Sequence, residues 1–182
     1  MRTIEIVDHD ATWAVAFERE AAGLWRVFGD DVLAVHHIGS TAVHALAAKP
    51  IVDILVVLRA TDTIERFSTG MEGLGYRVRG ECLDAEVPGT PGRFYFSKDT
   101  AGVRSHQVHA CAMSHPQVND LLAFRDYLRA HPHRAAEYGA LKRDLAGRHR
   151  YDVVAYMRGK HARVQDLLDM ARRWAATVGR AV

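Results

Sequence analysis

The chain has 182 residues, of which 48% are hydrophobic and 25% charged, with a formal net charge of +2. This length and composition are typical of one globular domain and exclude a disordered or fibrous chain. No apolar run approaches the roughly 20 residues of a membrane-spanning helix, and the N-terminus lacks the apolar stretch of a signal peptide. We therefore expect a cytoplasmic protein without a membrane partner. The two cysteines, Cys82 and Cys111, predict neither a disulfide framework nor a thiolate zinc site.

The first half of the chain alternates predicted strands and helices. Residues 3–7 predict a short strand, and Asp10 can cap a helix that Gly29 ends. Four more elements are predicted in chain order: a strand at 32–38, a short helix at 40–46, a strand at 51–58 and a helix at 64–74. The strand at 51–58 is apolar throughout except for Asp53, which is typical of a buried central strand.

The second half begins with strands and ends in helices. Strands are predicted at 76–79, 94–97 and 107–112, with a loop at 82–92, and three helical segments follow Pro116 with a break at His131 and Pro132. The sequence thus predicts an α/β (α+β) fold in which helices pack on a mixed sheet. We expect a single domain over residues 1–182, with a core at about 1–115 and C-terminal helices at about 117–178.

Charge is distributed unevenly along the chain. From residue 121 onward there are 13 basic and 6 acidic residues, whereas the first 120 residues contain 11 basic and 16 acidic ones. A basic region of this kind attracts phosphate-bearing ligands or nucleic acid, but a solvated helix face has the same composition. The second interpretation is favoured because aromatic residues do not regularly interleave the charges, a pattern that binding of single-stranded nucleic acid would favour.

A glycine-serine turn follows the predicted strand at 32–38. Gly39 allows close approach of a ligand to the backbone, and the hydroxyls of Ser40 and Thr41 can cap the following helix or donate to a phosphate oxygen. A helix start at this position presents backbone N–H groups to an anion. An isolated Gly-Ser pair is, however, more often only a helix cap.

Asp53, inside the apolar strand at 51–58, strengthens the functional interpretation of the turn. An ionised carboxylate inside an apolar strand costs several kcal/mol unless it has a partner, so it requires a cation, hydrogen-bond donors or an exposed strand end. A divalent metal that carries phosphate is one such partner. Hydrogen bonds from the neighbouring backbone, or from Lys49, are the structural alternative.

The segment HIGSTAVHALAAKPIVDILVVL resembles the signature of the GrpB family, whose members are similar to the polymerase-β-type nucleotidyltransferase superfamily. The resemblance extends over residues 5–175 and includes RFYFSK, HQVHA and AYMRGKHARVQDLL. It implies a nucleotidyltransferase-like fold in which the Gly39-Ser40 turn binds nucleotide phosphates and Asp53 is catalytic and holds Mg²⁺ or Mn²⁺. A nucleoside triphosphate or another phosphate-bearing small molecule is then the expected ligand.

The chain departs from the superfamily pattern at one position. A two-metal nucleotidyltransferase has a second carboxylate two residues after the first, on the same face of the strand, but here that residue is Leu55. His109 is the best candidate for a further metal ligand, although magnesium prefers oxygen. Asp84 and Glu86 are weaker candidates.

Several cationic residues are candidates for phosphate binding. Lys49 precedes the Asp53 strand and can reach that carboxylate or a phosphate, while Arg93 and Arg104 flank the later strands and can clamp phosphate or stay solvated. Two Tyr-Lys pairs at helical spacing, Tyr138 with Lys142 and Tyr156 with Lys160, are interpreted as helix packing.

Three hypotheses remain open. The first is a metal-dependent nucleotidyltransferase, the second a nucleotide- or phosphate-binding module that has lost catalysis, as Leu55 suggests, and the third an RNA-associated or scaffolding protein that uses its basic C-terminal helices. The sequence does not decide whether the chain is an enzyme.

Overall fold

The computed structural model describes residues 3–62, 64–82 and 90–179, and the chain divides into two compact units. The sheet unit comprises Thr12–Ile38 and Ile51–Val118. The helical unit comprises Met1–Ala11, Gly39–Pro50 and Asn119–Val182. Each unit is described below by itself.

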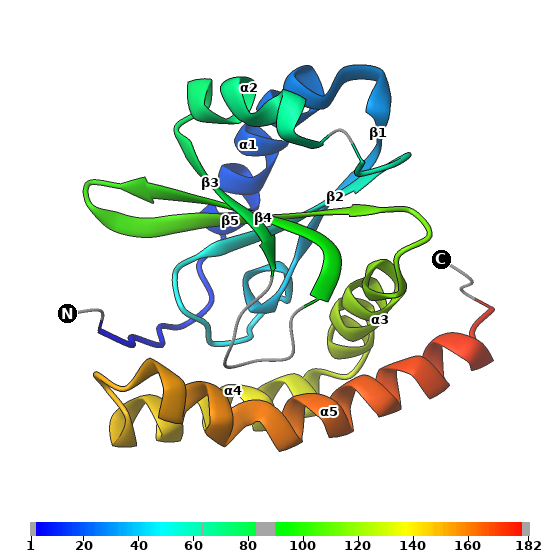
Figure 1. Cartoon of the computed structure of the whole chain (residues 1–182). Helices are drawn as coiled ribbons and strands as arrows, with labels where there is room; N and C mark the ends of the chain where they lie inside the picture. The colour runs from blue at the N-terminus through cyan, green and yellow to red at the C-terminus, as the bar shows by residue number, and fades with distance from the viewer. Residues whose placement is uncertain (1–2, 63, 83–89, 180–182) are drawn as a thin grey trace. The chain divides into compact units, whose positions relative to one another are not determined.

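The sheet unit contains one five-stranded mixed sheet (Figure 1). Its strands are β1 (Val32–Ile38), β2 (Val52–Leu58), β3 (Tyr76–Cys82), β4 (Thr90–Thr100) and β5 (Val103–Ala112). The spatial order is β1-β2-β5-β4-β3, with β2 and β5 parallel and the other neighbours antiparallel. β2 therefore lies between two strands, and its five last residues are buried, as the apolar sequence predicts.

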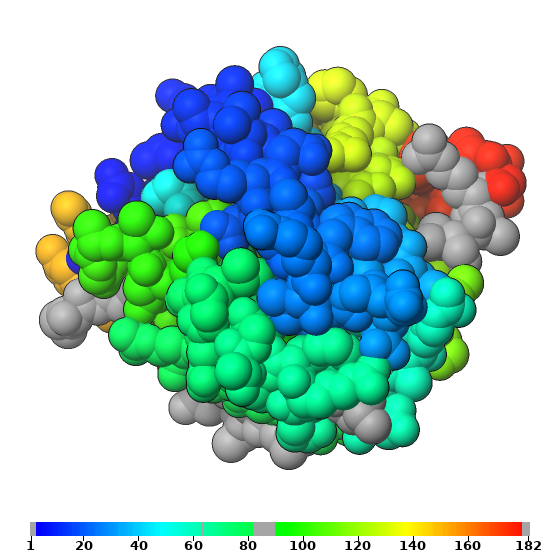
Figure 2. Space-filling view, turned by 90° about the horizontal axis from the view of Figure 1, so that it is seen from above, coloured from blue at the N-terminus to red at the C-terminus, as the bar shows by residue number. Residues whose placement is uncertain are grey.

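Two helices cover one face of this sheet, and Figures 1 and 2 show them side by side. They are α1 (Thr12–Phe28), which packs on β1 and β2, and α2 (Ser68–Gly73), which packs on β3 and is preceded by a 3₁₀ helix at Ile64–Phe67. α1 buries Trp13, Leu24 and Phe28, the helical-spacing pattern expected of an amphipathic helix. A 3₁₀ turn at Gly29–Asp31 then ends it, because Gly29 has a positive φ of 54°.

The helical unit is built on three helices. They are α3 (Pro116–Ala130), of which the residues from Asn119 on belong to this unit, α4 (Pro132–Arg148) and α5 (Val153–Thr177). α4 begins at Pro132, where a missing N–H costs no hydrogen bond, and Asp152 caps α5 by accepting from the Ala155 N–H at 2.9 Å. The core of the unit includes Leu46, Leu128 and Leu167, all at most 1% exposed.

Two predicted elements are wrong. Instead of a strand at residues 3–7, the structure has one isolated bridge between Val7 and Ala48. Instead of a helix at 40–46, it has a 3₁₀ turn of three residues, Ser40–Ala42. The turn stops because Val43 is extended and Ala45 adopts a left-handed φ of 59°, which is incompatible with a continuous right-handed helix.

The predicted fold class is confirmed: helices pack on a mixed sheet, and three helical segments follow it. Within the described ranges, no helix combines the length and the apolar character that crossing a membrane requires. The assignment of the whole chain to a single domain stays a prediction.

Candidate functional site

Asp53 lies near the start of β2, in the sheet unit, and is the half-buried member of an otherwise buried strand. Its register neighbours are Ile38 on β1 and Gln107 on β5. A carboxylate near a strand end keeps part of its hydration, which lowers the cost of its charge relative to the middle of the strand. The sequence leaves three explanations open for Asp53: a cation, hydrogen-bond donors or an exposed strand end. The position near a strand end is part of its environment in the structure.

The second carboxylate position is apolar. Leu55 is fully buried and shares the strand face of Asp53, and its register neighbour on β5 is His109. Gln107, directly beside Asp53, also shares this face and offers an amide oxygen. Among the described residues, no three His, Cys, Asp or Glu side chains gather in a way that could hold a metal ion.

His109 is held as a neutral imidazole. Its ring stacks on Tyr95 with the ring centroids 5.4 Å apart, and its Nδ1 atom is buried without a hydrogen-bond partner in the part of the chain that the structure describes. Burial, together with the positive charge of Arg93, lowers the pKa of His109 to about 3. The ring is thus in the protonation state of a metal ligand. On β5, however, it lies beside Leu55 and not beside Asp53.

The two candidate arginines of the sheet unit already contact other side chains. Arg93 Nη1 donates to Gln117 Oε1 at 2.7 Å. Arg104 Nε donates to Asp99 Oδ1 at 2.6 Å, and its Nη1 donates to the Tyr95 hydroxyl at 3.0 Å. Burial acts to lower the pKa of Arg104, but its hydrogen bond with Asp99 contributes to a net rise. A phosphate at Arg104 would therefore compete with an existing ion pair.

The Gly39-Ser40 turn belongs to the helical unit. Gly39 has φ 69° and ψ −169°, a conformation that is essentially restricted to glycine, which explains why the sequence has glycine at this position. The predicted helix start, which would present backbone N–H groups to an anion, is wrong, because the three-residue turn has no helix dipole of consequence. Thr41 is buried, at 3% exposure.

A buried lysine contacts this turn. Lys142 on α4 is 3% exposed, and its Nζ donates to the Ser40 hydroxyl at 2.7 Å. The same Nζ lies over the ring of Tyr138, 4.6 Å from the centroid. The sequence interpretation as plain helix packing missed this contact. The signal in the sequence was that Lys142 lies on an otherwise apolar helix face beside Tyr138. This pattern does not predict which residue Lys142 contacts.

A second group of cations surrounds Tyr156 in the same unit. Lys49 Nζ lies 4.3 Å from the centroid of the Tyr156 ring, and Lys160 Nζ lies 5.6 Å from it. The ring is 1% exposed, and burial raises the pKa of Tyr156 to about 12. At neutral pH the phenol is neutral, so it attracts both ammonium groups through its π-face and not through a phenolate charge.

The structure thus divides the predicted site residues between the units. Gly39, Ser40, Thr41 and Lys49 lie in the helical unit, and Asp53, Arg93, Arg104 and His109 lie in the sheet unit. The chain connects the two sets directly at two places: Gly39 follows Ile38, which pairs with Asp53, and Ile51 follows Pro50, which is next to Lys49. Asp84 and Glu86 lie outside the described residues.

Comparison with known proteins shows the family of this chain. Residues 3–170 match the family model described as GrpB protein. The chain belongs to the GrpB family. The resemblance seen in the Gly39 to Asp53 segment is confirmed.

Two relatives illustrate the extent of the match. The UPF0157 protein YqkA of Bacillus subtilis is 39% identical over 173 residues, which cover 95% of this chain and 48% of the relative. The chain therefore spans about half the length of that protein. The crystal structure of the conserved protein GrpB from Enterococcus faecalis is 34% identical and covers 93% of this chain and 99% of its own, with a TM-score of 0.84.

The fold also resembles that of nucleotidyltransferases. Terminal uridylyl transferase 4 from Trypanosoma brucei, solved with bound dUTP, matches with a TM-score of 0.53 over 94% of this chain and 55% of its own. Its identity to this chain is 12%, so the likeness is one of fold. The nucleotidyltransferase-like fold that the sequence predicts is thereby confirmed.

Proposed function

We propose that this chain binds a nucleotide through its phosphates at the Gly39-Ser40 turn. The observation that carries the proposal is the 2.7 Å hydrogen bond from Lys142 Nζ to the Ser40 hydroxyl. It brings a buried ammonium group to a turn where glycine already allows close approach. An ammonium group and a hydroxyl are both donors to phosphate oxygens, and lysine binds phosphate as a point charge.

The helical unit has two further candidate cations, Lys49 and Lys160, and both face the ring of Tyr156. Lys49 lies on the same segment of the chain as Ser40, residues 39–50. A triphosphate carries several negative charges, and additional ammonium groups neutralise them. A nucleoside triphosphate is therefore the ligand that this set of residues fits best, and other phosphate-bearing small molecules fit it less completely.

Transfer of the nucleotidyl group requires a divalent cation, Mg²⁺ or Mn²⁺, whose charge would stabilise the reacting phosphate. We expect Asp53 to be the protein ligand of one such ion, because magnesium is usually bound by one or two carboxylates and by the substrate phosphates. Asp53 would hold it, with the Gln107 oxygen or the His109 imidazole as neighbours. Leu55 does not fit a two-metal centre, so no step is assigned to a second ion.

A transfer assay tests the catalytic part of the proposal. The protein is incubated with α-labelled nucleoside triphosphates, Mg²⁺ or Mn²⁺ and a mixture of small metabolites, and labelled products are separated. We expect a labelled product that depends on the metal and is lost in Asp53→Asn. If the wild-type chain gives no product with either metal, catalysis is absent.

The burial of Leu55 favours a second function, a binding module without catalysis. This module binds nucleotide at the same turn and shows no turnover. Calorimetry with ATP distinguishes it from the enzyme, because binding is retained when the transfer assay is negative. If no nucleotide binds, both functions are excluded.

A further inference from the structure

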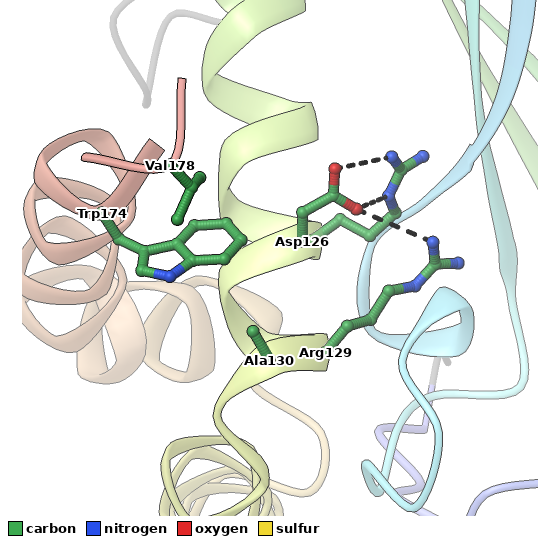
Figure 3. Close-up of a pocket in the computed structure, with 6 residues that line it drawn as sticks. Asp126, Arg129, Ala130, Trp174 and Val178 are labelled. Atoms are coloured by element: carbon green, nitrogen blue, oxygen red, sulfur yellow. Dashed lines mark hydrogen bonds and ion pairs between the residues drawn. The ribbon is translucent and has the colours of Figure 1, made fainter. Parts of the chain in front are cut away.

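A cavity lies in the helical unit, between α3 and the C-terminal end of α5 (Figure 3). Its volume is about 730 Å³, which is within the range of small-molecule sites. It is lined by Arg125, Asp126, Arg129, Ala130, Trp174 and Val178. None of these residues belongs to the site at the Gly39-Ser40 turn.

The polar wall of the cavity is a cluster with more positive than negative charge. Arg125 binds Asp126 through two hydrogen bonds, of 2.8 and 3.1 Å, and Arg129 Nη1 lies 3.7 Å from the same carboxylate. These two guanidinium groups share one carboxylate. Burial and then the charge of Arg125 lower the pKa of Arg129, which indicates crowding of positive charge that an anion would relieve. The Arg129 side chain is 45% exposed and is therefore accessible to a ligand.

The apolar wall is the indole of Trp174, which packs against two other aromatic rings. Trp174 makes edge-to-face contacts with Tyr127, at 6.0 Å between centroids, and with His131, at 5.7 Å. In Figure 3 the indole points from α5 toward α3, whereas the side chains of Asp126 and Arg129 extend from α3 in the opposite direction. Ala130 leaves space beside it, because its side chain is a single methyl group. A ring that is fixed before binding loses little conformational entropy when a ligand stacks on it.

Arg129 also links the cavity to the Gly39-Ser40 turn within the helical unit. Its Nε donates to the carbonyl oxygen of Ala42 at 2.9 Å, and Ala42 is the last residue of the 3₁₀ turn that begins at Ser40. Arg129 on α3 therefore contacts both the cavity and the turn that begins at Ser40.

We propose that this cavity binds one nucleotide unit, with its phosphate on Arg129 and its base against Trp174. Guanidinium groups bind phosphate bidentately, and bases stack on aromatic side chains without strict sequence preference. This nucleotide would be the acceptor to which the nucleotidyl group is transferred, and that role rests on the proposed function. Binding of a nucleotide in the cavity does not rest on the proposed function.

Binding of small probes by calorimetry tests the proposal. AMP contains both groups, ribose 5-phosphate lacks the base, and adenosine lacks the phosphate. We expect AMP to bind and each of the other two to bind at least about 10-fold more weakly, since stacking and a charged hydrogen bond each contribute on the order of a factor of 10. If AMP does not bind at millimolar concentration, the proposal is overturned.

A cavity-filling variant locates the bound AMP. Ala130 and Ala136 are both exposed helical alanines, but only Ala130 lines the cavity. We expect Ala130→Phe to weaken AMP binding at least 10-fold and Ala136→Phe to leave it unchanged. Should Ala130→Phe fail to fold, Val178→Glu replaces it: this residue lies beyond the end of α5 and is 47% exposed. Its negative charge should weaken AMP binding, whereas Val15→Glu on α1 should not. Unchanged AMP binding in the folded cavity variants overturns the proposal.

Two further arms separate this proposal from the proposed function and identify the source of the nucleotide. If Lys142→Met leaves binding of Mg-ATP unchanged while Ala130→Phe weakens AMP binding, the proposed function fails and the cavity remains a nucleotide site. If AMP binding falls in Lys142→Met and not in Ala130→Phe, AMP occupies the turn and the cavity proposal fails. An oligoadenylate of five residues that binds more tightly than AMP, and is also sensitive to Ala130→Phe, identifies the ligand as an RNA end; equal affinity identifies a free nucleotide.

Discussion

Both units contain ion pairs, but the candidate cations of the two units have different partners. In the sheet unit, Lys98 is paired with Glu20 and Arg104 with Asp99, each at 2.6 Å, so both cations stabilise the fold. In the helical unit, Lys142 contacts a serine hydroxyl at a glycine turn, and Arg129 contacts a backbone carbonyl beside a cavity. We infer that phosphate binding is to be sought at Lys142 and Arg129, although the sequence named neither of them as a phosphate ligand and pointed to arginines of the sheet unit instead.

The largest expected effect concerns the cores of the two units. Ile54 in the sheet unit and Leu167 in the helical unit are both fully buried. Replacing either by alanine should lower the free energy of unfolding by about 2–5 kcal/mol, because a cavity remains. Differential scanning calorimetry checks this. One shared transition in both variants supports the single-domain prediction, whereas a second transition that only one variant shifts shows that the units unfold separately.

A smaller effect is expected at Gly39. Because its φ of 69° and ψ of −169° suit glycine, Gly39→Ala should cost about 1–3 kcal/mol in unfolding free energy. It should also weaken ATP binding, since the turn must shift. Gly147→Ala on α4 is the control, because a Cβ there meets open space, and it should not lower stability. Denaturant titration measures both, and equal stabilities would show that the turn of Gly39 is not strained by a side chain.

The smallest of the stability effects is dependent on pH and belongs to the sheet unit. Burial lowers the pKa of His109 from 6.5 to about 3, so the unfolded chain binds the proton more tightly than the folded one. The stabilisation from a neutral His109 is therefore complete above about pH 6.5 and is lost as the pH falls toward 3. At pH 5.5 the loss should be about 1 kcal/mol.

The variant His109→Phe keeps an aromatic ring beside Tyr95 and removes the titrating group. Its unfolding free energy should fall less steeply than that of the wild type between pH 7.5 and 5.5. Chemical denaturation at the two pH values measures the unfolding free energy of both proteins. If it falls by the same amount in the wild type and in His109→Phe, His109 is accessible to protons in the folded state.

Much of the fold could be predicted because local patterns determine it. β1 has the predicted bounds, since an apolar run lies between Gly29 and Gly39, and the three C-terminal helices follow from helical periodicity and Pro132. The left-handed Ala45 has no signal in the sequence, because alanine favours helix, and it ends the predicted helix at 40–46 after one turn.

The site was less predictable because its contacts are distant in sequence. Lys142 and Ser40 are 102 positions apart, and no pattern in a single sequence pairs them. The same applies to Trp174 and the arginines of α3. Trp174 is far from Arg125 and Arg129 in the sequence, yet the fold places its indole in the same cavity as these arginines.

The central claim is that nucleotide phosphates bind where Lys142 meets Ser40, and calorimetric titration of Mg-ATP into Lys142→Met tests it most directly. Methionine preserves the length of the buried side chain and removes the charge, so the chain should stay folded. The account predicts a loss of affinity of about 10- to 100-fold, as expected for a hydrogen bond to a charged group, with no change in Lys98→Met. Equal affinity of the wild type and folded Lys142→Met for Mg-ATP would contradict it.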